Sequence, residues 1–293
     1  MRFSVFTAAT PEWEPEEAAR RIAALGYEGI EWRVTDQDPA DPPGFWAGNR
    51  ATWPLTGLEK AVPEIARVTR KAGLEFSGLG GYVLAADRAD VLRMLQATAK
   101  LEARRVRVRM PFADTEDYGT VFRRTRADVE WAAEEAGRLG VQVLVELHHR
   151  TITSSASAAL RLVDGIDPAT IGVIHDLGNL VIEGQEDTRS GLQLLGEYLA
   201  HVHVKNAVWR RTGDTGVDGD VGWEADWAPL REGIASVPDY FRALAEVGYD
   251  AWVTLEDFST ALPLEERLAD DLAHLRAAAS AATGSGAATG SGA

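Results

Sequence analysis

Three carboxylates and one histidine lie near the ends of four short apolar runs, and together they could hold a metal ion. They are Glu146, Asp176, His203 and Glu256. The run around His203 reads His-Val-His-Val-Lys-Asn over 201–206 and alternates with period two, as a strand with one polar face does. Burying such a face costs free energy unless the interior uses its polar groups. A divalent-metal site explains all four residues.

Strand alternation predicts that these side chains face the same interior. Glu146 shares a face with His148, and the charged residue of each run comes near the strand's C-terminal end. A single acidic residue there is more often a helix cap, but four ligand-type residues on successive strands are hard to explain as caps. Three carboxylates together would repel one another, and a divalent cation removes that penalty.

The ligand types narrow the choice of metal. The chain has no cysteine, which leaves only oxygen and imidazole ligands. Three carboxylates and one imidazole suit one Mn²⁺ ion, with Mg²⁺ or Co²⁺ as alternatives, and zinc is less favoured.

Further polar residues lie beside this set. His148 is a candidate proton carrier or hydrogen-bonding group, and Lys205 is a candidate for binding substrate oxygens. Arg109, at the end of the run Arg-Val-Arg-Val-Arg over 105–109, could bind a substrate oxygen or anion. The alternative for this arginine row is internal pairing with Glu31 and Glu75. Of the remaining histidines, His175 is expected to pack against a helix and His149 to point away.

A helix–glycine–strand unit recurs along the chain, at Gly26, Gly73, Gly140 and Gly248. We predict strands near 2–8, 27–34, 74–80, 103–110, 141–148, 171–177, 199–205 and 251–257. Helices are predicted near 15–25, 58–72, 88–101, 121–139, 154–164, 188–198, 237–247 and 264–280. This count indicates a single (β/α)8 TIM barrel. A doubly wound sheet usually has a glycine-rich turn after its first strand, and Thr7–Pro11 contains no glycine.

Two connections, Thr35–Gly57 and Asn206–Ser236, are longer than ordinary loops. They contain five of the nine tryptophans. Such tryptophans can form small apolar clusters within the loops. They can also wall a pocket and offer flat faces to a sugar or aromatic ring, so Trp46 and Trp223 are candidate substrate-binding residues.

Composition and charge indicate the domain limits, the type of partner and the localisation. We expect a catalytic domain over 1–281 and a flexible tail over 282–293, where Ala-Thr-Gly-Ser-Gly-Ala occurs twice. The formal charge of −15 disfavours nucleic acid as a partner. We see no signal peptide and no run of membrane-spanning length, and we expect a cytoplasmic protein.

The acidic strand ends, together with His-Val-His-Val-Lys-Asn and the segment Gly-Tyr-Asp-Ala-Trp-Val-Thr-Leu-Glu-Asp over 248–257, resemble the xylose isomerase-like barrel superfamily. Within it, the chain is most similar to sugar phosphate isomerase/epimerase-type proteins. The resemblance implies metal ligation by Glu146, Asp176, His203 and Glu256, with the two glutamates also moving the proton. Ketose 3-epimerases and endonuclease IV carry a histidine three residues after the aspartate, where this chain has Asn179.

The resemblance implies a metal-dependent isomerase or epimerase that shifts a proton next to the carbonyl of a sugar through an enediolate. The alternative is a lyase that uses the same enolisation on a 3-oxo-glycoside or an inosose. A non-catalytic sugar- or metal-binding barrel is less favoured, because the ligand set is complete. The expected partner is a small sugar or glycoside, and a homo-oligomer or a small partner subunit both stay open.

Overall fold

Eight parallel strands close into a barrel in the computed structural model, which describes residues 1–114, 116–184, 186–215 and 219–284. The barrel strands are β1 (Arg2–Phe6), β2 (Gly29–Val34), β4 (Glu75–Leu84), β5 (Arg105–Arg109), β6 (Gln142–Glu146), β7 (Ile171–Asp176), β8 (Leu199–Val204) and β11 (Trp252–Leu255). β1 pairs with β2 on one side and with β11 on the other, which closes the ring. The predicted (β/α)8 barrel is confirmed.

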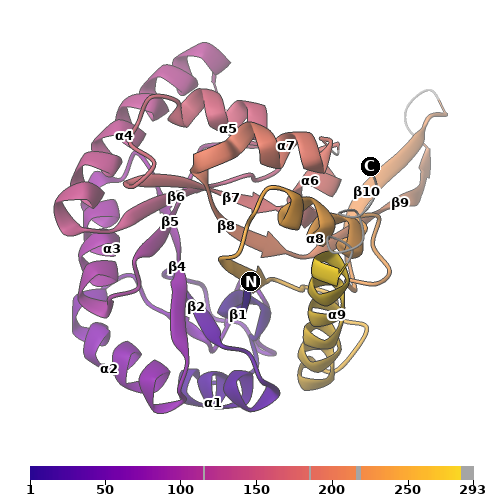
Figure 1. Cartoon of the computed structure of the whole chain (residues 1–293), viewed down its shortest axis with the longest axis horizontal. Coiled ribbons are helices and arrows are strands. Elements are labelled where there is room, and N and C mark those ends of the chain that lie inside the picture. Colours follow the sequence, from indigo (N-terminus) through magenta and orange to yellow (C-terminus); the bar gives the residue numbers. More distant parts are fainter. Residues whose placement is uncertain (115, 185, 216–218, 285–293) are drawn as a thin grey trace, which may run out of the picture.

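Helices cover the outside of the strands (Figure 1). They are α1 (Pro15–Leu25), α2 (Leu58–Lys71), α3 (Arg88–Leu101), α4 (Tyr118–Leu139), α5 (Ala156–Val163), α7 (Thr188–Leu195), α8 (Val237–Glu246) and α9 (Leu264–Gly284). Gly26 and Gly140 end α1 and α4 with φ of 97° and 68°, left-handed conformations that favour glycine. Among the described helices, none has the length and apolar content to cross a bilayer.

The helix α6 (Leu177–Glu183) and the strands β3 (Thr52–Trp53), β9 (Asn206–Thr215) and β10 (Val221–Ala228) were not predicted. β3 pairs with the end of β2, and the short helix α6 begins directly after β7. The segment predicted as one long loop over 206–236 contains an antiparallel hairpin of β9 and β10, which projects away from the barrel (Figure 1). Helix α9 also continues three residues past the predicted domain boundary, and residues 285–293 of the predicted tail lie outside the described residues.

The barrel interior changes from apolar to polar along the strands. Leu144, Ile174 and Ala200 form a small buried apolar cluster. Glu146 and Asp176 lie two residues further along β6 and β7, so alternation places them on the same inner face nearer the strands' C-terminal ends. This layering positions a polar site above an apolar layer, at the end of the barrel where its loops converge.

Candidate metal centre and cavity

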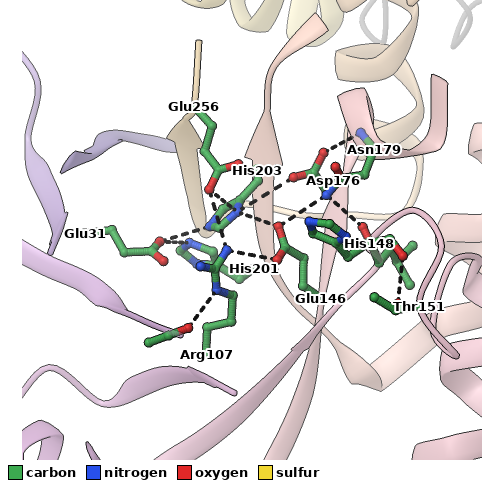
Figure 2. A network of polar contacts seen from close by, with 12 residues as sticks. Glu31, Arg107, Glu146, His148, Thr151, Asp176, Asn179, His201, His203 and Glu256 are labelled. Carbon is green, nitrogen blue, oxygen red and sulfur yellow. Dashed lines mark hydrogen bonds and ion pairs between the residues drawn. The ribbon is translucent and has the colours of Figure 1, made fainter. Parts of the chain in front are cut away.

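Glu146, Asp176, His203 and Glu256 converge on one buried point (Figure 2). Each offers a potential ligand atom, and these atoms all lie within 4.8 Å of one another. Three of the residues end or nearly end β6, β7 and β8, and Glu256 directly follows β11. Neighbouring strands hold them in register, because Asp176 is paired with His203 and His203 with Thr254. The four side chains selected from the sequence are therefore brought together.

The ring of His203 lies between carboxylates on both sides (Figure 2). Its Nε2 atom is 3.0 Å from Glu31 Oε2, and its Nδ1 atom is 3.1 Å from Glu256 Oε1 and 3.5 Å from Glu146 Oε1. Burial alone would lower the pKa of His203, but Glu256 and Glu31 outweigh it and raise this pKa well above its usual value. The Nδ1 position thus favours a positive charge, which either a proton or a metal ion can supply.

Two buried cations balance part of the carboxylate charge. Arg107 Nη1 donates to Glu146 Oε2 at 2.9 Å, and the Lys205 ammonium contacts both Asp176 and Glu256. Burial would raise the pKa of Glu146, but Arg107 above all holds it well below its usual value. Burial instead dominates at Asp176 and raises its pKa to about 7, with Glu256 and Glu146 adding to it and Lys205 opposing it. When all three carboxylates are ionised, these two cations balance two of the three negative charges.

This donor set fits a divalent cation. His203 Nδ1 and Glu256 Oε1 are both buried without a hydrogen-bond partner among the described atoms, although they lie only 3.1 Å apart. Unpaired buried acceptors are destabilising, and a cation between them would satisfy both. Asp176 serves two roles, because Oδ1 accepts from the Asn179 backbone N–H at 2.8 Å and caps α6, while Oδ2 faces the site. The capping alternative considered from the sequence thus coexists with a ligand position.

A cavity of about 350 Å³ opens onto this point. Its polar lining includes Glu146, Glu256, Lys205 and His148, and its aromatic lining includes Trp46, Tyr82, Trp227 and Phe258. His148 Nδ1 donates to the His149 carbonyl at 3.0 Å, which leaves Nε2 as an acceptor. Burial lowers the pKa of His148, so this imidazole is neutral at neutral pH. A neutral ring with a free acceptor can take up a proton.

Several neighbouring residues differ from the sequence predictions. His149 lines the same cavity rather than pointing away, because its Nδ1 donates to Asn179 Oδ1 at 2.9 Å. The alternative that the arginine row pairs with Glu31 and Glu75 is wrong, since Arg107 pairs with Glu146 and Glu75 pairs with Arg2. His175 does pack against a helix as expected, with Nδ1 2.8 Å from the Tyr240 hydroxyl of α8.

The two selected tryptophans lie in different places. Trp46 lines the cavity with its ring centre 4.7 Å from that of Phe258. Trp223 lies on β10 with 59% of its surface exposed, and it is not part of the cavity wall. Trp227, on the same strand, lines the cavity instead, 5.5 Å from Phe258 between ring centres. The hairpin therefore contributes to the pocket through a different tryptophan from the one predicted.

Sequence reasoning assigned no role at the site to Glu31. Its Oε2 atom accepts from His201 Nε2 and His203 Nε2, each at 3.0 Å, and its side chain is fully buried. Burial would raise its pKa, but His203 and His201 lower it, so Glu31 is ionised. The sequence signal that could have identified Glu31 is a carboxylate within an otherwise apolar strand, Gly-Ile-Glu-Trp over 29–32. The sequence does not indicate which cation would pair with it.

Known proteins resemble this chain both in sequence and in structure. Inosose dehydratase from Lacticaseibacillus casei is 25% identical over 158 residues, and the match spans about half the length of each chain, 50% of this one and 51% of the dehydratase. The structure of 3-keto-D-glucoside 4-epimerase from E. coli superposes with a TM-score of 0.70 at 17% identity, covering 94% of this chain and 99% of the epimerase. A xylose isomerase-like barrel from Mycobacterium smegmatis in complex with magnesium superposes with a TM-score of 0.68 at 17% identity, covering 96% and 97%.

The structural likenesses, at these low identities, concern the fold. The family assignment comes from the sequence itself, because the family model described as xylose isomerase-like TIM barrel matches residues 19–278. That range includes all four converging residues and every barrel strand after β1. This chain belongs to the xylose isomerase-like TIM barrel family.

Proposed function

We propose that this protein is a divalent-metal-dependent isomerase or epimerase that moves a proton on the carbon next to the carbonyl of a sugar. The observation that carries the proposal is the convergence of Glu146, at the end of β6, and Glu256, directly after β11, in one buried ligand set that lines a cavity of about 350 Å³. Cavities of this size and mixed polarity hold small molecules. The family membership and the epimerase of similar fold support this choice.

Glu146, Asp176, His203 and Glu256 would hold the cation, with Mn²⁺ the expected ion and Mg²⁺ or Co²⁺ as alternatives. When bound, the ion supplies electrostatic stabilisation to the charge that develops on an enolising carbonyl. The magnesium complex of a barrel of similar fold supports a hard divalent ion.

The chain's own residues would carry the proton transfer. One ionised glutamate would accept the carbon-bound proton and later release it to solvent. The other would take up a proton from solvent and deliver it to the opposite side of the planar enediolate, so that the number of protons is conserved. Arg107 and Lys205 keep these carboxylates ionised in a buried site. His148, a neutral imidazole lining the cavity, is placed to hold or relay a proton from a substrate hydroxyl.

A lyase is the second candidate, and the match to inosose dehydratase favours it. The first step would be the same removal of a proton next to a carbonyl. The outcome would differ afterwards, because expulsion of a leaving group, water or an aglycone, replaces reprotonation. Proton exchange alone therefore does not distinguish the lyase from the isomerase, and the two reactions are distinguished by their products.

Metal removal gives the direct test. Protein stripped with a chelator is expected to lose exchange of the substrate's carbon-bound hydrogen with D₂O, and added Mn²⁺ is expected to restore it, measured by NMR over a panel of ketoses, an inosose and a 3-oxo-glycoside. Release of water or aglycone would select the lyase. Equal exchange by metal-free and metal-loaded protein would contradict the proposal.

The two tryptophans form a matched pair for testing the cavity. Trp46→Ala is expected to weaken binding of the exchanging substrate by about tenfold, because an aromatic wall is lost. Trp223→Ala should bind it as the unchanged protein does, since its side chain lies outside the cavity. Titration calorimetry and thermal melting of both variants separate binding from stability. Equal affinities for both variants would show that the ring of Trp46 plays no part in binding.

A further inference from the structure

Arg109 is a cation that lines the cavity and has no carboxylate partner among the described residues. It ends β5, lines the cavity and is half-buried, with its guanidinium carbon 5.8 Å from the ring centre of Tyr82. In the part of the chain that the structure describes, no carboxylate pairs with it. The carboxylate that acts on it most is Glu146, which is already bonded to Arg107.

The charges around the cavity show what Arg109 adds. Arg107 and Lys205 pair with Glu146, Asp176 and Glu256, and the ionised Glu31 pairs with His201 and His203. These groups therefore have partners of their own, and none of them forms an ion pair with Arg109. Arg109 adds a separate positive charge to the cavity wall, in a chain whose formal net charge is −15.

Arg109 is also held in place. The Tyr82 ring lies against both guanidinium groups, with its centre 4.8 Å from Arg107 and 5.8 Å from Arg109. The Arg109 carbonyl accepts from the Ala85 backbone N–H at 3.0 Å, which fixes the end of β5. Burial and the Arg107 charge lower the pKa of Arg109, so an anion in the cavity would stabilise its charged form. A positioned, desolvated guanidinium binds carboxylates well.

We propose that the substrate of this site carries a carboxylate in addition to its reacting carbonyl, and that Arg109 binds this carboxylate. The inference rests on the proposed function and narrows it from sugars in general to keto sugar acids. A carboxylate fits better than a phosphate, because a phosphate monoester carries roughly −1.5 to −2 charges at neutral pH. Among the described residues that line the cavity, Arg109 is the one cation without a carboxylate partner. The planar guanidinium also matches a carboxylate through two parallel hydrogen bonds.

Three probes that differ only at carbon 6 test the inference: D-fructose, D-fructuronate and D-fructose 6-phosphate. We expect kcat/KM for solvent exchange, with Mn²⁺ present, to be about 10- to 100-fold higher for D-fructuronate than for D-fructose. Arg109→Gln should remove this preference, so that kcat/KM for D-fructuronate no longer exceeds kcat/KM for D-fructose in the same variant. Arg109→Lys should keep part of it, because the charge remains and the paired hydrogen bonds do not.

Binding measured by titration calorimetry on the same variants separates this inference from the proposed function. Exchange of D-fructose at least as fast as D-fructuronate, or a preference that survives Arg109→Gln, overturns the inference and leaves the function intact. A stronger preference for D-fructose 6-phosphate also overturns it in favour of a phosphate. If no probe exchanges but D-fructuronate binding depends on Arg109, the function fails and the inference stands. If the probes show no exchange and D-fructuronate does not bind, both the inference and the proposed function are overturned. Melting temperature and metal content of each variant check that fold and ligand set are unchanged.

Discussion

Glu146→Gln and Glu256→Gln are each expected to abolish solvent exchange at the substrate carbon, with losses of about 10²- to 10⁴-fold per bound metal ion. Glutamine keeps a carbonyl oxygen that can ligate, but it cannot accept a proton from carbon. The two glutamates reach the ligand set from β6 and from the residue after β11, two strands that are not neighbours in the barrel. Loss of either one removes a base that epimerisation in both directions requires.

Asp176→Asn is the matched control for this prediction. Asp176 offers a ligand oxygen at the same point, but its other oxygen caps α6 and its carboxylate lies behind the cavity wall. We expect its loss to lower metal content while exchange per bound metal ion stays within about tenfold of the unchanged protein. Metal content by mass spectrometry and exchange by NMR give both quantities. If Glu146→Gln or Glu256→Gln keeps near-normal exchange with metal bound, that glutamate is only a ligand, and His148 becomes the candidate base.

The residues that alternation selected were predictable because a parallel barrel imposes a simple rule. Side chains two apart on one strand share a face, and strand ends meet at one end of the barrel, so Glu146 and Asp176 had to approach each other. The helix–glycine–strand repeat predicted the fold for the same reason, since Gly26 and Gly140 end helices in a left-handed conformation whatever the tertiary context.

Contacts across the barrel were not predictable from one strand at a time. The alternative for the arginine row was pairing with Glu31 and Glu75, yet Arg107 bonds to Glu146 on the adjacent strand β6. Glu31 instead reaches across the interior to His201 on β8. Which partner lies opposite depends on the stagger of all the strands, and a sequence pattern does not specify it. The short helix α6 was not predicted, because a helix of seven residues is too short to show a clear hydrophobic periodicity.

The hairpin β9–β10 illustrates a second limit. Its tryptophans at positions 209, 223 and 227 looked equivalent in the sequence, but strand pairing gives each a different environment. Trp209 Nε1 donates to the Val181 carbonyl of α6, Trp227 lines the cavity, and Trp223 is exposed. Strand register decides which face each side chain occupies, and the register of a projecting hairpin depends on turn geometry rather than on a buried pattern.

Glu31→Gln is expected to lower the affinity for Mn²⁺ by about 10- to 100-fold, although Glu31 is not itself part of the ligand set. The ionised carboxylate accepts from His203 Nε2, which fixes the proton on that nitrogen and leaves Nδ1 facing the three carboxylates. The same oxygen accepts from His201 Nε2. A neutral amide accepts hydrogen bonds more weakly and can present its NH₂ group instead, which would favour the tautomer with the proton on Nδ1.

Glu75→Gln is the control, because it removes one negative charge from an ion pair with Arg2 at the start of β4, at the opposite end of the strand from the site. We expect its affinity for Mn²⁺ to equal that of the unchanged protein in a calorimetric titration. The melting temperature of each metal-free variant separates a ligation defect from a folding defect, since a general loss of stability would appear without metal. If metal-free Glu31→Gln melts earlier but binds Mn²⁺ with unchanged affinity, Glu31 serves only to satisfy two buried imidazoles. If metal-free Glu31→Gln is as stable as the unchanged protein but binds Mn²⁺ more weakly, the Glu31 carboxylate determines which nitrogen of His203 is free to ligate. It would do so from the side of the His203 ring opposite the metal ion.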